Sequence, residues 1–154
     1  VIAVNAPLKF KRFSSKFAET LNAYNDCCHY LGNSNLAVEF MKNDADNPHI
    51  NYLRCPVSAF VQVKQLMRKV RKSLPDIHIP TLVIQAKKDP KVAPQSGPAI
   101  FKLLGTNRKH FSWIYYNMHG IVRGIIAGEV FKEVESFLEL YGLINSTGNI
   151  SRST

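Results

Sequence analysis

The sequence has few cysteines, and their placement argues against a disulfide-stabilised fold. Cys27 and Cys28 are adjacent, and Cys55 makes the count odd. No pair of cysteines or histidines has the CxxC or HxxxH spacing of a metal site. The sequence therefore predicts no metal ion and no cofactor. Because disulfides are rare in the reducing cytosol, this cysteine usage also predicts a cytoplasmic protein.

Long hydrophobic runs are also missing. No segment approaches the roughly 18 consecutive apolar residues of a membrane-spanning helix. Residues 1–10 lack the basic start and the small-residue cleavage site of a signal peptide. The 154 residues, 45% of them hydrophobic, suffice for one domain with a sizeable core. We expect residues 1–144 to form one partial α/β domain and the polar residues 145–154 to form a disordered tail.

Acidic residues are scarce relative to basic ones. Eleven aspartates and glutamates stand against 20 lysines and arginines, which gives a net charge of +9 and invites a nucleic-acid-binding interpretation. In residues 56–74, however, apolar and basic side chains fall on opposite faces of a predicted helix. The apolar positions are Val63, Leu66, Met67, Val70 and Leu74, and the basic ones are Lys64, Arg68, Arg71 and Lys72. A solvated basic face needs no partner, so nucleic acid binding is the weaker interpretation.

Three apolar segments predict buried strands. They span residues 1–5, 81–86 and 110–116, and the last two lack polar alternation. Predicted helices follow these two strands, at 96–104 with Ser96 as N-cap and at 129–141 with Gly142 after its end. Strands without alternation, each followed by a helix, are typical of a parallel sheet covered on both faces. The sequence predicts an α/β fold of about three parallel strands with flanking helices.

The connection between the first two strands is unusually long. It has about 75 residues, far more than a crossover needs. Helices are predicted at 15–31, 34–43 and 56–74. Part of this segment, about residues 9–55, is therefore expected to be a small helical cap over one end of the sheet.

Two loops carry the candidate catalytic residues. Asp89 lies three residues past Ala86, and His119 lies three residues past Tyr116. Ligands of parallel α/β sheets bind beyond the carboxyl ends of the strands. An aspartate that orients a histidine there forms the acid and the general base of a nucleophilic triad. Taken singly, Asp89 before Pro90 is more often a turn and a loop histidine more often surface decoration, but their pairing favours the triad.

These loops carry a resemblance to a known family. IHIPTLVIQAKKDPKVAPQSG (77–97), MHGIV (118–122) and the FLE of the final helix (137–139) resemble the C-terminal half of α/β-hydrolases. The closest type is the small bacterial carboxylesterase and monoacylglycerol-lipase (lysophospholipase-like) group. The opening VIAVNAPL resembles the strand that follows the nucleophile helix in that group. The resemblance implies that Asp89 is the triad acid, that His119 is the triad base, and that the substrate is a small carboxylic ester.

The family's nucleophile has no counterpart in this sequence. Its serine occupies a G-x-S-x-G elbow between an earlier strand and helix, and no such pentapeptide occurs here. The nearest match surrounds Ser34, but it lacks the second glycine and follows no strand. The chain also begins at Val1 in apparent mid-strand. We therefore expect a C-terminal fragment of a serine ester hydrolase, inactive alone, with the elbow roughly 20–30 residues upstream.

Two further interpretations stay open. The first interpretation is a non-catalytic binding or oligomerisation domain. The first strand would leave an unpaired sheet edge, which favours pairing with another chain. That edge would pair with the missing N-terminal half or with a second copy. Apolar residues of the cap either line an acyl pocket or pack the cap on the sheet. They are Phe13, Phe17, Tyr24, Tyr30, Phe40 and Met41.

Overall fold

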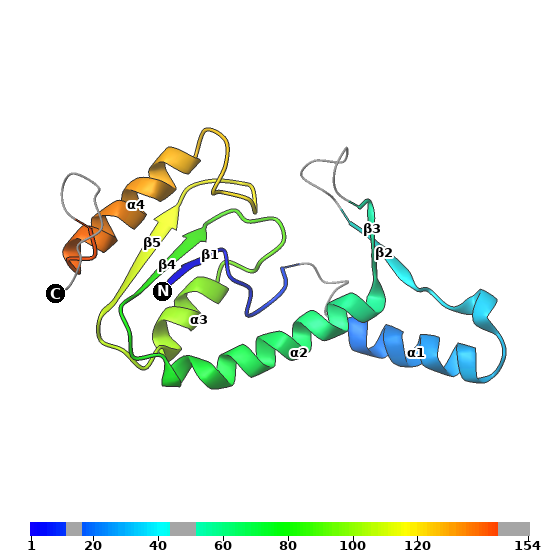
Figure 1. Cartoon of the computed structure of the whole chain (residues 1–154). Helices are drawn as coiled ribbons and strands as arrows, with labels where there is room; N and C mark the ends of the chain where they lie inside the picture. Colours follow the sequence, from blue (N-terminus) through cyan, green and yellow to red (C-terminus); the bar gives the residue numbers. More distant parts are fainter. Residues whose placement is uncertain (12–16, 44–51, 145–154) are drawn as a thin grey trace.

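A parallel sheet of three strands lies at one side of the molecule (Figure 1). The computed structural model describes residues 1–11, 17–43 and 52–144. The strand order is β1 (Ile2–Val4), β4 (Thr81–Ala86), β5 (Lys109–Ile114), and both pairings are parallel. The predicted α/β fold is confirmed. Phe13 and the predicted tail at 145–154 lie outside the described residues.

The middle strand, β4, is buried along its whole length. All six of its residues are inaccessible to solvent. Its neighbours pair with it in register, Ile2 opposite Leu82 on one side and Thr81 opposite Lys109 on the other. An apolar run without alternation forms this strand because helices cover both faces of the sheet.

The two faces of β4 support separate clusters. Leu82, Ile84 and Ala86 point toward α4 (Ala127–Leu140), where Val130 and Phe137 complete the core. Val83 points the other way, toward Ile100 of α3 (Ser96–Leu103). Gly97 lets α3 approach the sheet, since a Cβ there would lie 2.8 Å from Cβ of Gln85 and 2.9 Å from the Phe111 ring. The loops that carry Asp89 and His119 therefore emerge from a sheet packed on both sides.

The segment between β1 and β4 mixes helix and strand. It contains α1 (Ala18–Tyr30), η2 (Ser34–Leu36), the antiparallel pair β2 (Phe40–Lys42) and β3 (Arg54–Pro56), α2 (Val57–Ser73) and η3 (Leu74–Asp76). The long helix α2 runs from the β2–β3 pair to the sheet (Figure 1). We call α1 through β3, described at 18–43 and 52–56, the cap module. We call β1, β4, β5, α3 and α4 the sheet module.

The helix predicted at 34–43 is wrong. Only a single 3₁₀ turn forms at its start, and its end is strand β2. The side chain of Asn25 explains the difference, because it donates to the Val38 carbonyl at 2.9 Å and accepts from the Val38 amide at 2.8 Å. An amide side chain that satisfies both backbone groups replaces the helical hydrogen bonds and holds this segment extended.

Two details at the strand and helix ends also differ. Strand β5 stops at Ile114 rather than at residue 116, since its partner β4 ends at Ala86 and the Tyr116 amide turns back to the Ile114 carbonyl. His119 therefore lies five residues past its strand. Ser96 does not cap α3, because its hydroxyl accepts instead from the Lys9 amide at 3.1 Å. Gly142 ends α4 with a φ of 65°, as its place after the helix predicted.

The amphipathic helix α2 forms as predicted, but its two faces are used differently. Met67 and Leu74 are buried, whereas the apolar positions Val63, Leu66 and Val70 are exposed. The basic side chains Lys64 and Arg68 both bind Glu19 of α1. These hydrogen bonds, that of Lys64 foremost, hold the pKa of the Glu19 carboxyl below its ordinary value. The predicted free basic face is thus partly paired within the chain.

Candidate active site

The loop after β4 holds the Asp89 carboxylate in one orientation. Its Oδ1 accepts from the backbone amides of Lys91 at 2.7 Å and Val92 at 2.8 Å. Lys11 donates to the Asp89 carbonyl at 2.7 Å and fixes the backbone as well. The side chain is fully buried. An aspartate that accepts from amides two and three residues ahead forms its own turn, which positions its second oxygen.

That second oxygen binds His119. The distance from Asp89 Oδ2 to His119 Nδ1 is 2.8 Å, although the residues are 30 positions apart. Burial alone would raise the pKa of the Asp89 carboxyl, but the hydrogen bonds from His119, Val92 and Lys91 outweigh it and lower that pKa. An ionised carboxylate only accepts, so Nδ1 carries the proton and Nε2 of the neutral ring is an acceptor. The His119 side chain is 37% exposed, which leaves Nε2 accessible to a reactant.

A buried asparagine fixes the backbone of the histidine loop. Asn5, at the carboxyl end of β1, donates from Nδ2 to the His119 carbonyl at 2.6 Å. Its Oδ1 accepts from the Ala86 amide at 2.6 Å and from Gln85 Nε2 at 3.2 Å. Asn5 has a φ of 46°, and asparagine is among the residues that adopt this region most readily. Sequence reasoning missed Asn5, although a polar residue directly after an apolar strand was a visible signal.

A cavity of about 640 Å³ lies beside His119. Its walls come from the β2–β3 pair of the cap module and from the loops that follow β4 and β5. They are formed by Phe40, Asn43, Tyr52, Arg54, Cys55, Pro56, Lys91, His119, Gly120 and Arg123. Among the cap aromatics proposed for an acyl pocket, Phe40 lines this cavity, whereas Tyr30 is 91% exposed. Cavities of a few hundred Å³ accommodate small-molecule ligands.

The chain matches a known protein family over most of its length. The family model described as serine aminopeptidase, S33 (Hydrolase_4) matches residues 5–124. The chain belongs to this family. The resemblance to α/β-hydrolases drawn from the sequence is confirmed. No curated protein sequence matches the chain.

Solved structures share the fold of this S33-family chain. A chain of the metagenome-derived lipolytic enzymes LipS and LipT has 18% identity and a TM-score of 0.70, over 90% of this chain and 54% of its own. The monoacylglycerol lipase of Paleococcus ferrophilus has 18% identity and a TM-score of 0.64, over 90% and 58%. A soluble variant of the monoglyceride lipase of Saccharomyces cerevisiae has 11% and 0.62, over 91% and 55%. The chain thus spans little more than half the length of these enzymes.

The S33-family chain also contains a serine–histidine–carboxylate contact in the cap module, separate from the Asp89–His119 pair. Ser34 Oγ lies 2.9 Å from His29 Nδ1, and His29 Nε2 lies 3.2 Å from Glu39 Oε1. All three residues are exposed to water, unlike the buried Asp89. The carboxylate also binds a different ring nitrogen, Nε2 in His29 and Nδ1 in His119. Ser34 therefore contacts a different histidine from the one that Asp89 orients.

Cys27, Cys28 and Cys55 are free thiols. Within residues 1–11, 17–43 and 52–144, histidines, cysteines and carboxylates nowhere form a group of three able to hold a metal ion. In the same residues, each helix is too short or too polar to cross a membrane.

Proposed function

We propose that Asp89 and His119 are the acid and the base of a serine ester hydrolase whose nucleophilic serine is supplied from outside this sequence. The observation that carries the proposal is the 2.8 Å hydrogen bond between the two side chains, with Nε2 accessible beside a ligand-sized cavity. The family's hydrolase fold and its lipase and esterase neighbours support a carboxylic ester as substrate. The sequence has no G-x-S-x-G elbow, which supports a separate source for the serine.

In the proposed reaction, each group has a defined role. His119 Nε2 accepts the serine proton while the serine oxygen bonds to the ester carbonyl carbon. The protonated ring then gives that proton to the departing alkoxide, which leaves as an alcohol. Water attacks the acyl-serine in the same way, with Nε2 as base, and the serine regains its proton as the acid is released. Asp89 keeps the proton on Nδ1 and stabilises the imidazolium.

The 154-residue chain provides the first test. We expect no hydrolysis of p-nitrophenyl butyrate and no labelling by a fluorophosphonate probe. The reason is that, in the described residues, no serine hydroxyl forms a hydrogen bond with His119 Nε2. Intact-mass spectrometry after incubation with the probe measures the outcome. Labelling of any serine in this chain would contradict the proposal of an external nucleophile.

The full-length protein, including whatever precedes Val1, provides the second test. His119→Ala should lower kcat for p-nitrophenyl butyrate by about 10⁴-fold or more, and Asp89→Asn by about 10³–10⁴-fold, because the wrong tautomer is then favoured. Ser34→Ala is the matched control and should leave kcat unchanged. Wild-type kcat in both triad variants would refute the assigned roles.

The open edge of β1 favours a second candidate function, that of a binding or oligomerisation domain. In the described residues β1 pairs only with β4, and Val1 and Ile2 are exposed. An unpaired strand edge is a template for another strand, from an N-terminal segment or a second copy. Sedimentation velocity of the 154-residue chain tests self-association. A monomer at every concentration, combined with hydrolysis by the full-length protein, would exclude this alternative.

A further inference from the structure

Three basic side chains, those of Arg54, Lys91 and Arg123, line the cavity beside His119. Among the described residues that line it, none is acidic. In the described part of the chain, none of these three side chains forms an ion pair with a carboxylate. Like charges that share one cavity repel one another, and a bound anion relieves that repulsion. The charge of this cavity therefore points to the chemistry of its ligand.

The three cations reach the cavity from three separate segments. Arg54 comes from β3, with its guanidinium carbon 4.9 Å from the centre of the Phe40 ring. Lys91 follows Asp89, and its ammonium lies 3.4 Å from Asn43 Oδ1. Arg123 follows His119, and its guanidinium lies over Gly120, since a Cβ on that glycine would be 3.5 Å from Arg123 Nε. Contacts thus define the position of each cation within the cavity.

We propose that this cavity binds a carboxylic ester that carries a phosphate or carboxylate group elsewhere in the molecule. This inference rests on the proposed function and specifies its substrate class. The anionic group lies on Arg54, Lys91 and Arg123, and the ester carbonyl lies at His119 Nε2. Guanidinium groups suit this role because their planar donors match the oxygens of phosphate and carboxylate. The Phe40 and Tyr52 rings in the same wall contact the apolar part of the ligand.

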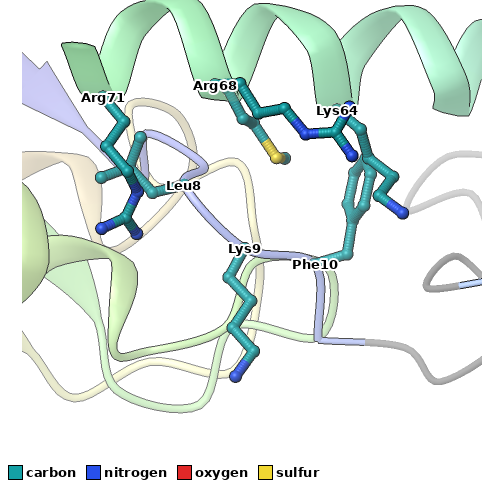
Figure 2. A pocket seen from close by; sticks show the side chains of 7 residues that line it. Leu8, Lys9, Phe10, Lys64, Arg68 and Arg71 are labelled. Atoms are coloured by element: carbon teal, nitrogen blue, oxygen red, sulfur yellow. The ribbon is translucent and has the colours of Figure 1, made fainter.

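A second basic cavity provides an internal control (Figure 2). It has a volume of about 190 Å³ and is lined by Leu8, Lys9, Phe10, Lys64, Met67, Arg68 and Arg71. Here Lys64 and Arg68 already bind Glu19, and neither Asp89 nor His119 lines the walls. Figure 2 shows Arg71 on α2, beside Leu8. Arg71→Gln therefore removes one positive charge from the chain without changing the cavity at His119.

The test compares two esters that differ in one phosphate. The 154-residue chain is titrated with 1-octanoylglycerol 3-phosphate and with 1-octanoylglycerol, and the His119 imidazole signals are followed by NMR. We expect the phosphate-bearing ester to bind about tenfold more tightly, with a preference that falls as salt is added. Arg54→Gln and Arg123→Gln should each reduce the preference by about threefold or more. Arg71→Gln should leave it unchanged, and inorganic phosphate alone should bind more weakly than the phosphate-bearing ester.

Three results would overturn the inference. They are equal affinity for the two esters, an unchanged preference in both the Arg54 and Arg123 variants, and equal affinity for inorganic phosphate. The assay needs no nucleophile, so it is read independently of hydrolysis. If the full-length protein hydrolyses both esters through His119 at the same kcat/KM, the proposed function stands and the anionic substrate class fails. If the phosphate-bearing ester binds but His119→Ala leaves hydrolysis unchanged, the catalytic role fails alone.

Discussion

The sheet module and the cap module differ in how much apolar surface they bury. Every residue of β4 is buried, and its side chains support a cluster on each face. The cap module instead exposes many large apolar side chains, among them Tyr30, Leu31, Leu36, Val38, Phe40 and Leu53. Asp89 and His119, the proposed catalytic pair, are attached to the first module, while the second forms a wall of the cavity. Residues that need fixed distances are thus held by the densely packed part.

The largest effect is expected in the sheet core. Ile84→Ala should lower the free energy of unfolding by about 2–5 kcal/mol. Ile84 lies on β4, is fully buried in the cluster shared with α4, and leaves a cavity when its side chain is shortened. Urea denaturation followed by circular dichroism measures the change. A loss below about 1 kcal/mol would show that the sheet module is no better packed than the cap module.

The next effect is expected where the sheet meets the loop that carries His119. Asn5→Gly keeps the positive φ accessible but removes all three side-chain hydrogen bonds, and should cost about 1–3 kcal/mol. The loop that carries His119 then loses its anchor, so the downfield Nδ1 proton signal should broaden or disappear. Asn5→Ala should cost more, because alanine is strained at this φ. A sharp Nδ1 signal in Asn5→Gly would show that the loop keeps its conformation without the hydrogen bond from Asn5.

A smaller effect depends on pH. Hydrogen bonds hold the Asp89 pKa below its ordinary value of 3.8, so the ionised carboxylate stabilises the folded state. This contribution is complete above about pH 4 and is lost as the pH falls through the lowered pKa. Urea denaturation between pH 3 and pH 7 should therefore show a shallower acid dependence in Asp89→Asn than in the wild type. If the free energy of unfolding had the same pH dependence below pH 4 in both proteins, the lowered pKa of Asp89 would be contradicted.

The smallest effect is expected on the cap surface. Tyr30→Ala removes a large ring that is 91% exposed and should change the free energy of unfolding by less than about 0.5 kcal/mol. The same urea assay applies, with Ile84→Ala as the opposite extreme. A loss above about 1 kcal/mol would mean that Tyr30 is covered by another surface in solution.

The sheet was predictable because its signals are local. Residues 81–86 form a continuous apolar run, and Asp89 and His119 follow two such runs at short distances. The segment at 34–43 was not predictable, because the Asn25 side chain overrides its local preference by bonding to Val38. The exposure of Leu66 likewise depends on which part of the molecule packs against α2. Helical periodicity predicts an apolar face, but it does not predict what covers that face.

Asn5 shows the same limit within the candidate site. Its partner, the His119 carbonyl, is 114 positions away along the chain. No spacing rule connects these two residues, because their contact depends on the order of β1, β4 and β5. The pairing of Asp89 with His119 was accessible because both follow neighbouring strands at the same edge of the sheet.

The register of β4 against β5 determines whether Asp89 and His119 meet at all. Pairing ends at Ala86 opposite Ile114, and both residues lie a few positions beyond that point. A slip of one residue would displace one loop by about 3.3 Å and turn every side chain of the strand to the other face. A 2.8 Å hydrogen bond does not survive such a displacement. A chain that aligns its strands wrongly therefore cannot form the Asp89–His119 hydrogen bond, which arises only once the sheet has its final alignment.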